Sequence, residues 1–262
     1  MKKYISLVLA VLMMFSLMPI HSIQAEEDAT DLILWYKLDQ TSGTVAVDSS
    51  GNENHGTVNG GATWLDGNGI EFDGVDGWIS MPNGLLSGVE EITVITNVYF
   101  DPDNANPVWV FSFASHADPN NYENTKYFGL LSDASNRFRA TITNRRWSAE
   151  QNATYEPGFQ KGVWRQVAVT LSGNTMALYQ DGVKLAENTG ITLSPKDMED
   201  TIANYIARPA YIPDRYLKGK MSDFRVYNRA LSEEEIQILS SKNDSDNVMK
   251  DYDLLTLGDV SA

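Results

Sequence analysis

The sequence predicts an all-β fold, a two-sheet antiparallel sandwich in one domain with one short helix near the C-terminus. Three observations support this prediction. Many short segments alternate apolar and polar residues, turn signals separate them at short intervals, and only one segment has a helical pattern. A doubly wound α/β fold would need helices between the strands, and the sequence indicates none there.

The clearest strand patterns lie in the middle of the chain. Residues 92–100 carry apolar side chains at alternate positions, which predicts a half-buried strand. Residues 137–143 repeat the pattern, with Phe138, Ala140 and Ile142 on the inner face and arginines on the outer face. Both segments are therefore expected to cover one core.

A predicted hairpin follows. Residues 163–171 form a strand, residues 172–174 turn the chain, and residues 175–180 return. Asp181-Gly182 then signals a type I′ turn into residues 183–187, because both central residues of that turn need a positive φ. The remaining β-rich segments are residues 32–38, 69–72, 78–81, 108–115, 127–131, 205–208 and 218–227.

One helix is expected after the last strand. Ser232 stands at an N-cap position and Glu235 follows three residues later, which is the pattern of a capping box. Acidic residues also fill the first turn, where the helix dipole favours negative charge. The segment up to Leu239 is therefore predicted to be a short helix.

Composition excludes several classes of function. The 262 residues contain 20 Lys and Arg against 35 Asp and Glu, a net charge of −15, so nucleic acids and anionic membranes are unsuitable partners. An acidic surface suits neutral ligands or divalent cations. The chain has no cysteine, which excludes disulfides and thiolate metal sites and leaves oxygen or histidine as metal ligands.

The first 25 residues have the pattern of a secretory signal. Lys2 and Lys3 precede an apolar run from Ile5 to Ile20, and a polar stretch ends at Ala25. A membrane anchor is the alternative, but the run is short for a bilayer span. We expect cleavage after Ala25 and an extracellular, monomeric protein that has no membrane segment after signal removal.

The remaining chain divides into two parts. Residues 26–240 are expected to form the sandwich domain. Residues 241–262 shift to a composition rich in Asn, Asp and Ser, and they are interpreted as a linker or the start of a following module.

Six motifs occur in an order that resembles a known family. The chain is similar to LamG-like jelly-roll domains of the concanavalin A-like lectin/glucanase superfamily over about residues 31–239. The motifs are Trp35-Tyr-Lys-Leu-Asp-Gln-Thr-Ser-Gly43, Asp48-Ser-Ser-Gly-Asn-Glu-Asn-His-Gly56, Phe72-Asp-Gly-Val-Asp-Gly-Trp78, Gly162-Val-Trp-Arg-Gln-Val-Ala-Val169, Leu178-Tyr-Gln-Asp-Gly182 and Asp223-Phe-Arg-Val-Tyr-Asn-Arg-Ala-Leu-Ser232.

The resemblance implies a jelly-roll sandwich and a role in carbohydrate binding. Such domains are found beside bacterial secreted glycoside hydrolases, often directed at arabinan or xylan, as carbohydrate-binding or spacer modules. We therefore expect a secreted, non-catalytic module with a plant-type polysaccharide as partner. One alternative is the N-terminal fragment of a glycoside hydrolase whose catalytic domain is absent here. Another is a structural or adhesive module that contacts protein.

One loop has the composition of a calcium site. Residues 48–56 gather short oxygen-bearing side chains around glycines, and Asp48 and Asn52 are candidate donors for one structural calcium ion. An Asx-turn loop, in which these side chains bond their own backbone, is an equally weighted alternative. The topology of the family implies Asp223 as a further ligand, because it places the last strand beside the first.

Candidate sugar-binding residues are those without a clear core role. Trp35, Trp78 and Trp164 lie in strand patterns and are interpreted as core, whereas Trp147 follows two arginines in a polar segment. In the alternative interpretation, the tyrosines cover an edge of the sandwich and the arginines pair with acids. The complete set of carbohydrate-binding candidates is Arg145, Trp147, Tyr155, Tyr211, Asp214, Arg215 and Tyr216.

No catalytic residue is predicted. Jelly-roll glucanases of the superfamily carry their carboxylates in an E-x-D-x-x-E or E-x-D-x-E string on one strand, and the sequence has neither string. A G-x-S-x-G elbow is also absent. We therefore expect no catalytic centre within these residues.

Overall fold

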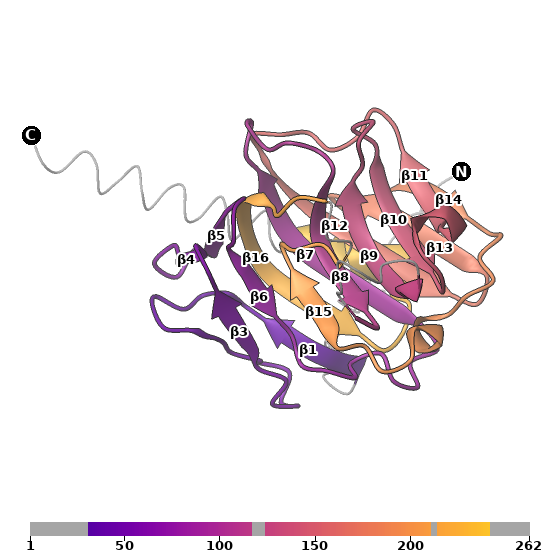
Figure 1. Ribbon diagram of the computed structural model, residues 1–262, viewed down its shortest axis with the longest axis horizontal. Coiled ribbons are helices and arrows are strands. Elements are labelled where there is room, and N and C mark those ends of the chain that lie inside the picture. The colour runs from indigo at the N-terminus through magenta and orange to yellow at the C-terminus, as the bar shows by residue number, and fades with distance from the viewer. Residues whose placement is uncertain (1–30, 117–123, 211–213, 242–262) are drawn as a thin grey trace, which may run out of the picture.

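The structure is a computed structural model that describes residues 31–116, 124–210 and 214–241. In these ranges the chain forms two stacked sheets of eight strands each, and all ladders between the strands are antiparallel. Figure 1 shows the two layers, with β7 and β16 behind β8 and β15. The predicted all-β, jelly-roll sandwich is confirmed.

The first sheet has β7 and β16 at its centre. Its order is β14-β13-β12-β7-β16-β5-β4, and β1 pairs with the C-terminal half of β16. The strands are β1 (Leu32–Tyr36), β4 (Thr63–Trp64), β5 (Ile70–Asp73), β7 (Ile92–Phe100), β12 (Trp164–Ser172), β13 (Thr175–Gln180), β14 (Val183–Asn188) and β16 (Lys218–Tyr227).

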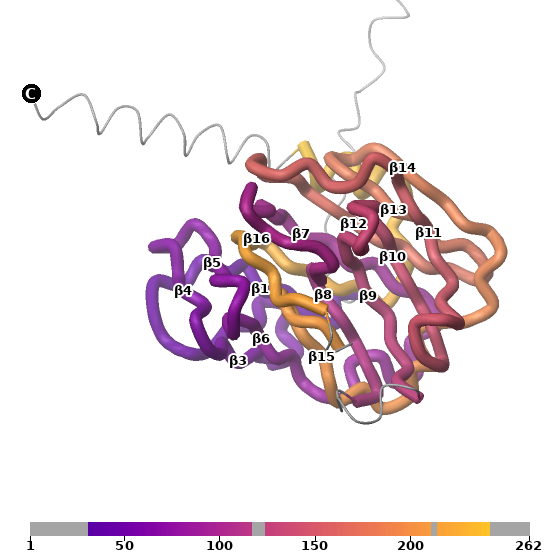
Figure 2. Tube along the Cα trace, turned by 45° about the horizontal axis from the view of Figure 1, so that its top comes forward, coloured from indigo at the N-terminus to yellow at the C-terminus, as the bar shows by residue number. Residues whose placement is uncertain are grey.

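The second sheet has the order β11-β10-β9-β8-β15-β6-β3-β2. Figure 2, a turned view, again places β3 to β6 at one end of the sandwich and β11 and β14 at the other. The strands are β2 (Val45–Ala46), β3 (Gly56–Asn59), β6 (Trp78–Ser80), β8 (Val108–Ala114), β9 (Tyr127–Ser132), β10 (Phe138–Thr143), β11 (Gln151–Tyr155) and β15 (Ala203–Ile206).

The main hydrophobic core fills the space between the sheets. The inner-face prediction for β10 is confirmed, since Phe138, Ala140 and Ile142 all belong to this core. Phe111 of β8 joins the layers, because its ring centroid lies 5.9 Å from those of Phe128 in β9 and Phe224 in β16.

Strand β7 has the predicted bounds but is not half-buried. Eight of its nine positions are buried, because a second apolar cluster covers the outer face of the first sheet. Ile95 of β7 packs there with Leu231 and Ile236, which belong to the segment of the C-terminal helix. The helix occupies residues 233–241, so burial on both faces replaces the expected exposure.

Two local sequence signals, the type I′ turn and the helix capping box, are confirmed. Asp181 and Gly182 have φ values of 50° and 77° between β13 and β14, as a type I′ turn requires. The capping box also forms, since Ser232 Oγ accepts the N–H of Glu235 at 3.2 Å and Glu235 Oε2 accepts the N–H of Ser232 at 2.7 Å.

None of the three tryptophans interpreted as core residues lies in the main core, although Trp35 packs against the second cluster. Trp35 and Trp78 are only partly buried, and Trp164 is 38% exposed. The tryptophan that is buried is Trp109, at 1% exposure. Alternation along a strand does not say which of its faces the core covers, and these side chains project from the outer faces of the sheets.

The sequence prediction for residues 1–25 lies outside the described residues. The predicted linker at residues 241–262 also lies outside them, apart from Ser241, which belongs to the helix. In the part of the chain that the structure describes, no helix combines the length and the hydrophobicity that a bilayer span requires.

Candidate functional site

A pocket of about 310 Å³ lies on the outer face of the second sheet. Strands β8, β9 and β10 form its floor and walls, and residues that precede β11 and β16 close two of its sides. The lining residues are Pro107, Trp109, Tyr127, Leu131, Asp133, Ala134, Ser135, Arg137, Arg139, Trp147, Glu150 and Asp214.

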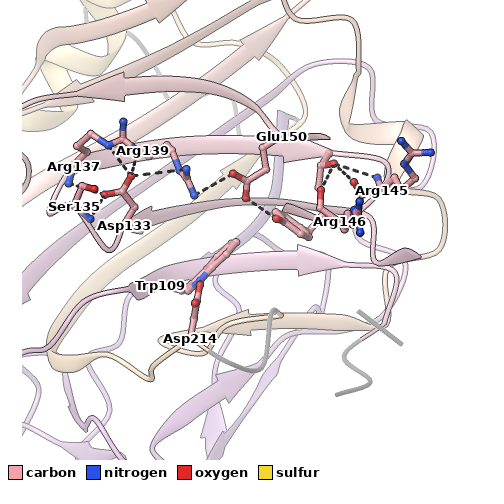
Figure 3. Close-up of polar contacts among 11 residues, drawn as sticks. Trp109, Asp133, Ser135, Arg137, Arg139, Arg145, Arg146, Glu150 and Asp214 are labelled. Carbon is pink, nitrogen blue, oxygen red and sulfur yellow. Dashed lines mark hydrogen bonds and ion pairs between the residues drawn. The ribbon is translucent and has the colours of Figure 1, made fainter. Parts of the chain in front are cut away.

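The floor of this pocket is aromatic. Trp109 and Tyr127 point away from the main core and pack edge to face, with ring centroids 5.5 Å apart. Trp109 Nε1 donates a hydrogen bond of 2.7 Å to Asp214 Oδ2, which fixes both side chains (Figure 3). Burial raises the pKa of the Asp214 carboxyl, and the bond from Trp109 partly offsets that rise.

A chain of charged groups forms one wall. Arg139 of β10 lies between two carboxylates, with Nη2 3.1 Å from Glu150 Oε2 and Nη1 3.8 Å from Asp133 Oδ2. Tyr127 donates its hydroxyl to Glu150 Oε1 at 2.5 Å, and Arg137 Nε donates to Asp133 Oδ2 at 2.8 Å. Figure 3 shows this chain of contacts along the sheet.

The two carboxylates of this wall have opposite pKa shifts. Burial raises the pKa of Glu150, and the charge of Arg139 only partly offsets it. Burial would also raise the pKa of Asp133, but hydrogen bonds from Arg137 and from the N–H of Ser135 hold it below its usual value. The wall is therefore a network of fixed donors and acceptors.

Trp147 forms the rim of the pocket. It begins a short 3-10 helix, Trp147–Ala149, after Arg146 turns the chain with a φ of 38°. Its side chain is 57% exposed although it lines the pocket. An exposed indole beside fixed polar groups can stack on the C–H face of a sugar while the polar groups bind its hydroxyls.

The structure brings together two of the seven predicted sugar-binding residues. Trp147 and Asp214 line the same pocket although they are 67 positions apart in the sequence. Arg145 lies near the rim, where its backbone bonds Thr143 Oγ1. Figure 3 shows its side chain at the end of the charged row.

The other candidates lie elsewhere. Tyr155 is predicted to lack a core role, but it lies on β11 and packs partly buried against the main core. Arg215 and Tyr216 line a second, neighbouring pocket. Tyr211 lies outside the described residues.

Sequence reasoning missed most of the pocket. One signal was available for Arg139, because it alternates with the inner residues of a predicted strand and so must face outward. Trp109, Tyr127 and Glu150 carry no such signal, since β8 and β9 are apolar on both faces and the position of Glu150 depends on its tertiary contact with Arg139.

The predicted calcium loop is held by hydrogen bonds. Asp48 Oδ1 accepts the N–H groups of Trp35 and Ser50, and Oδ2 accepts the N–H of Asn54 and the hydroxyl of Ser50, all within 2.9 Å. Asn52 Nδ2 donates to the carbonyl of Leu32 at 2.6 Å. The bonds from Ser50 and Asn54 are the contacts of the Asx-turn alternative, whereas Trp35 and Leu32 belong to β1. Together these bonds occupy the Asp48 oxygens that a cation would need.

The predicted neighbour relation of Asp223 is correct. β1 pairs with β16, and Asp223 lies at a bulge of β16 with a φ of 53°. Its carboxylate accepts hydrogen bonds from Trp35 Nε1 at 2.6 Å and from Arg225 Nε at 2.8 Å, so it is already paired with the guanidinium of Arg225. Among the described residues, no three His, Cys, Asp or Glu side chains form a metal-binding group.

Comparisons with known proteins agree with this architecture. A model of the concanavalin A-like lectin/glucanases superfamily matches residues 73–237. No curated protein matches the chain.

Several solved structures share the fold. Domain 4 of a GH43 extracellular arabinanase from Geobacillus stearothermophilus, in complex with arabinotriose, has a TM-score of 0.61 and 19% identity and covers 80% of this chain and 98% of that domain. Trypanosoma rangeli sialidase in complex with sialic acid has a TM-score of 0.60 and 18% identity, covering 82% of this chain and 33% of the sialidase.

The binding domain of Paraclostridial Mosquitocidal Protein 1 is also similar, with a TM-score of 0.61 and 15% identity over 82% of this chain and 53% of that one. The chain therefore spans only about a third of the sialidase and about half of this third protein. At these identities the likeness concerns the fold.

Proposed function

The chain belongs to the concanavalin A-like lectin/glucanase superfamily, and from this premise we propose that it is a secreted, non-catalytic module that binds carbohydrate. The binding site is the pocket rimmed by Trp147. Export by residues 1–25 is part of the proposal, and those residues lie outside the described ranges.

The observation that carries the proposal is the exposed Trp147 above a wall of paired charges. Sugar rings present apolar C–H faces and many hydroxyls, so a sugar site needs an aromatic surface and fixed polar groups. Trp147 is 57% exposed, and Arg139 lies between Asp133 and Glu150 in the adjacent wall. Because these groups hold one another in place, little ordering remains to be done when a ligand binds.

The contacts of the carboxyl groups favour binding over catalysis. Glu150 is held by Arg139 and by the Tyr127 hydroxyl, and Asp214 is held by Trp109. A general acid or nucleophile must reach a glycosidic oxygen or carbon, whereas these carboxyls are engaged with protein groups.

We expect the ligand to be a neutral polysaccharide of plant type. The net charge of −15 opposes the approach of acidic polymers. The fold is shared with an arabinanase domain that was solved with arabinotriose, which makes arabinan the first polymer to test. The proposed partner protein is a glycoside hydrolase that the module would direct to its substrate.

Affinity electrophoresis tests the proposal. Arabinan embedded in a native gel should retard the purified protein, and Trp147→Ala should abolish the retardation. The melting temperature should change little, because the indole is mostly exposed.

Trp164→Ala is the matched control. Trp164 is also partly exposed, at 38%, but it lies on the first sheet and packs on Tyr99. Retardation should survive in this variant. Wild-type protein that migrates freely in arabinan and other neutral polysaccharide gels would refute carbohydrate binding.

A further inference from the structure

A second pocket, of about 230 Å³, adjoins the first. It lies between the end of β5, the connection from β7 to β8 and the segment that leads into β16. Its polar lining consists of Asp73, Asp103, Asn104, Arg215, Tyr216 and Lys218.

Two backbone segments, at residues 105–107 and 214–215, lie between the pockets, and each segment contributes residues to the lining of both. Pro107 and Asp214 line the first pocket, whereas Ala105 and Arg215 line the second. The segments are joined by a hydrogen bond of 3.1 Å from Arg215 N–H to the carbonyl of Pro107. Asp214 and Arg215 are consecutive residues, about 3.8 Å apart at their Cα atoms, so the two pockets are close neighbours.

Asn104 lines the second pocket and carries an unmet hydrogen-bond donor. Its side chain is fixed, since Oδ1 accepts the N–H of Lys218 at 2.8 Å. The residue is 3% exposed, yet its Nδ2 has no hydrogen-bond partner among the described residues. A buried donor without an acceptor costs free energy.

Two further groups of this pocket are suited to a sugar. Arg215 is exposed, and its guanidinium forms no ion pair in the described part of the chain. The guanidinium of Arg208 lies 5.9 Å from the ring centroid of Tyr216, and it lies 4.3 Å from the ring centroids of both Trp78 and Tyr205. The tyrosine is therefore a supported aromatic surface and Arg215 a free planar donor.

We propose that one neutral polysaccharide chain occupies both pockets, with sugar units at Trp147 in the first and at Arg215 and Tyr216 in the second. Two-pocket binding rests on the carbohydrate-binding function proposed above. Asp73 and Asp103 balance Arg215 and Lys218 in charge, so the second pocket, like the first, favours hydroxyls over carboxylates.

Isothermal titration with arabinobiose, arabinotriose and longer linear arabino-oligosaccharides tests the proposal. Affinity should rise by about tenfold once the oligosaccharide is long enough to reach the second pocket. Arg215→Ala should remove this gain and leave the affinity for the shortest ligand that binds unchanged. Lys37→Ala, which removes an exposed positive charge directly after β1, should keep the gain.

The outcomes separate this proposal from the one before it. Binding that depends on Trp147 but does not strengthen with chain length, or a gain that survives Arg215→Ala, overturns two-pocket binding and leaves the carbohydrate-binding function intact. Absence of binding to every arabino-oligosaccharide overturns two-pocket binding, and free migration in all the neutral polysaccharide gels as well overturns both proposals. Preference for polygalacturonate over neutral chains overturns the assignment of a neutral ligand.

Discussion

Arg139 is the cation that neutralises the carboxylates in the wall of the first pocket. Its guanidinium faces Glu150 and Asp133, and the Glu150 side chain is only 5% exposed. Burying a carboxylate is costly without a paired cation, so the pair is fixed once the strand has formed. The same fixed geometry makes Arg139 available as part of a rigid wall for a ligand.

Replacing Arg139 with methionine should lower the free energy of unfolding by about 3 kcal/mol at neutral pH, because Glu150 stays buried without its cation. Without Arg139 the pKa of Glu150 in the folded state lies further above its unfolded value. A raised carboxyl pKa contributes stability that is present below the unfolded value, about 4.3, and is lost as pH rises through the folded value. The deficit should therefore shrink in acid.

Urea unfolding at neutral pH and near the unfolded pKa of glutamate measures both effects. Arg145→Met is the control, since Arg145 is exposed and its hydrogen bonds run through its backbone. It should change stability little at either pH. A deficit in Arg139→Met that is equal at both pH values would contradict the role given to Glu150.

At the scale of elements, Glu235 links the start of the C-terminal helix to the segment that precedes it. Glu235 closes the capping box with Ser232, and both of its oxygens accept hydrogen bonds from Arg229, at 2.7 and 3.0 Å. Arg229 also bonds Asp31 at 2.6 Å, which ties the helix to the start of β1. The bonds from Arg229 are the main reason that the pKa of Glu235 is lowered to about 2.

Glu235→Gln should cost about 1 kcal/mol at neutral pH, the usual cost of a lost cap. A depressed carboxyl pKa contributes stability above the unfolded value of about 4.3, and this is lost as pH falls toward the folded value. The difference in free energy of unfolding between wild type and variant should therefore shrink as the pH falls below about 4.3 and vanish near pH 2. Denaturant unfolding across this pH range measures it.

Glu234→Gln provides the matched control, because Glu234 is exposed on the same turn and has no hydrogen bond in the described structure. It should leave stability nearly unchanged across that range. A Glu235 variant with an acid profile parallel to that of wild type would show that Arg229 does not depress this pKa.

At the scale of the whole molecule, the predicted calcium ion would act on the stability of the fold. The ion stays a proposal with Asp48, Asn52 and Asp223 as donors. Binding to the folded state would raise the melting temperature by several degrees at saturating calcium. Melting curves in calcium and in EDTA measure this rise, and magnesium serves as the control cation.

Binding would have to displace the hydrogen bonds that Asp48 now accepts from Trp35, Ser50 and Asn54. Superimposable melting curves would therefore contradict the calcium proposal and leave the Asx-turn loop as the account of this segment. Asp48 has a lowered pKa in that loop, because these bonds outweigh the effect of burial.

What the sequence determined by itself was local. The period of two identified β7 and β10, the Asp181-Gly182 pair identified a hairpin, and Ser232 with Glu235 identified the start of the helix. These features depend on residues that are close in the chain, so propensity and spacing suffice to predict them.

What only the tertiary structure decided was which side chains meet. β8 lies between β9 and β15, a strand far away in sequence, and that order brings Trp109, Glu150 and Asp214 from three separate segments to one pocket. It also decided that Tyr155 faces the core and that a helix covers the outer face of β7. The physical reason is that alternation defines two faces for every strand, but only the packing of the sheets determines which face is buried and which residues become neighbours.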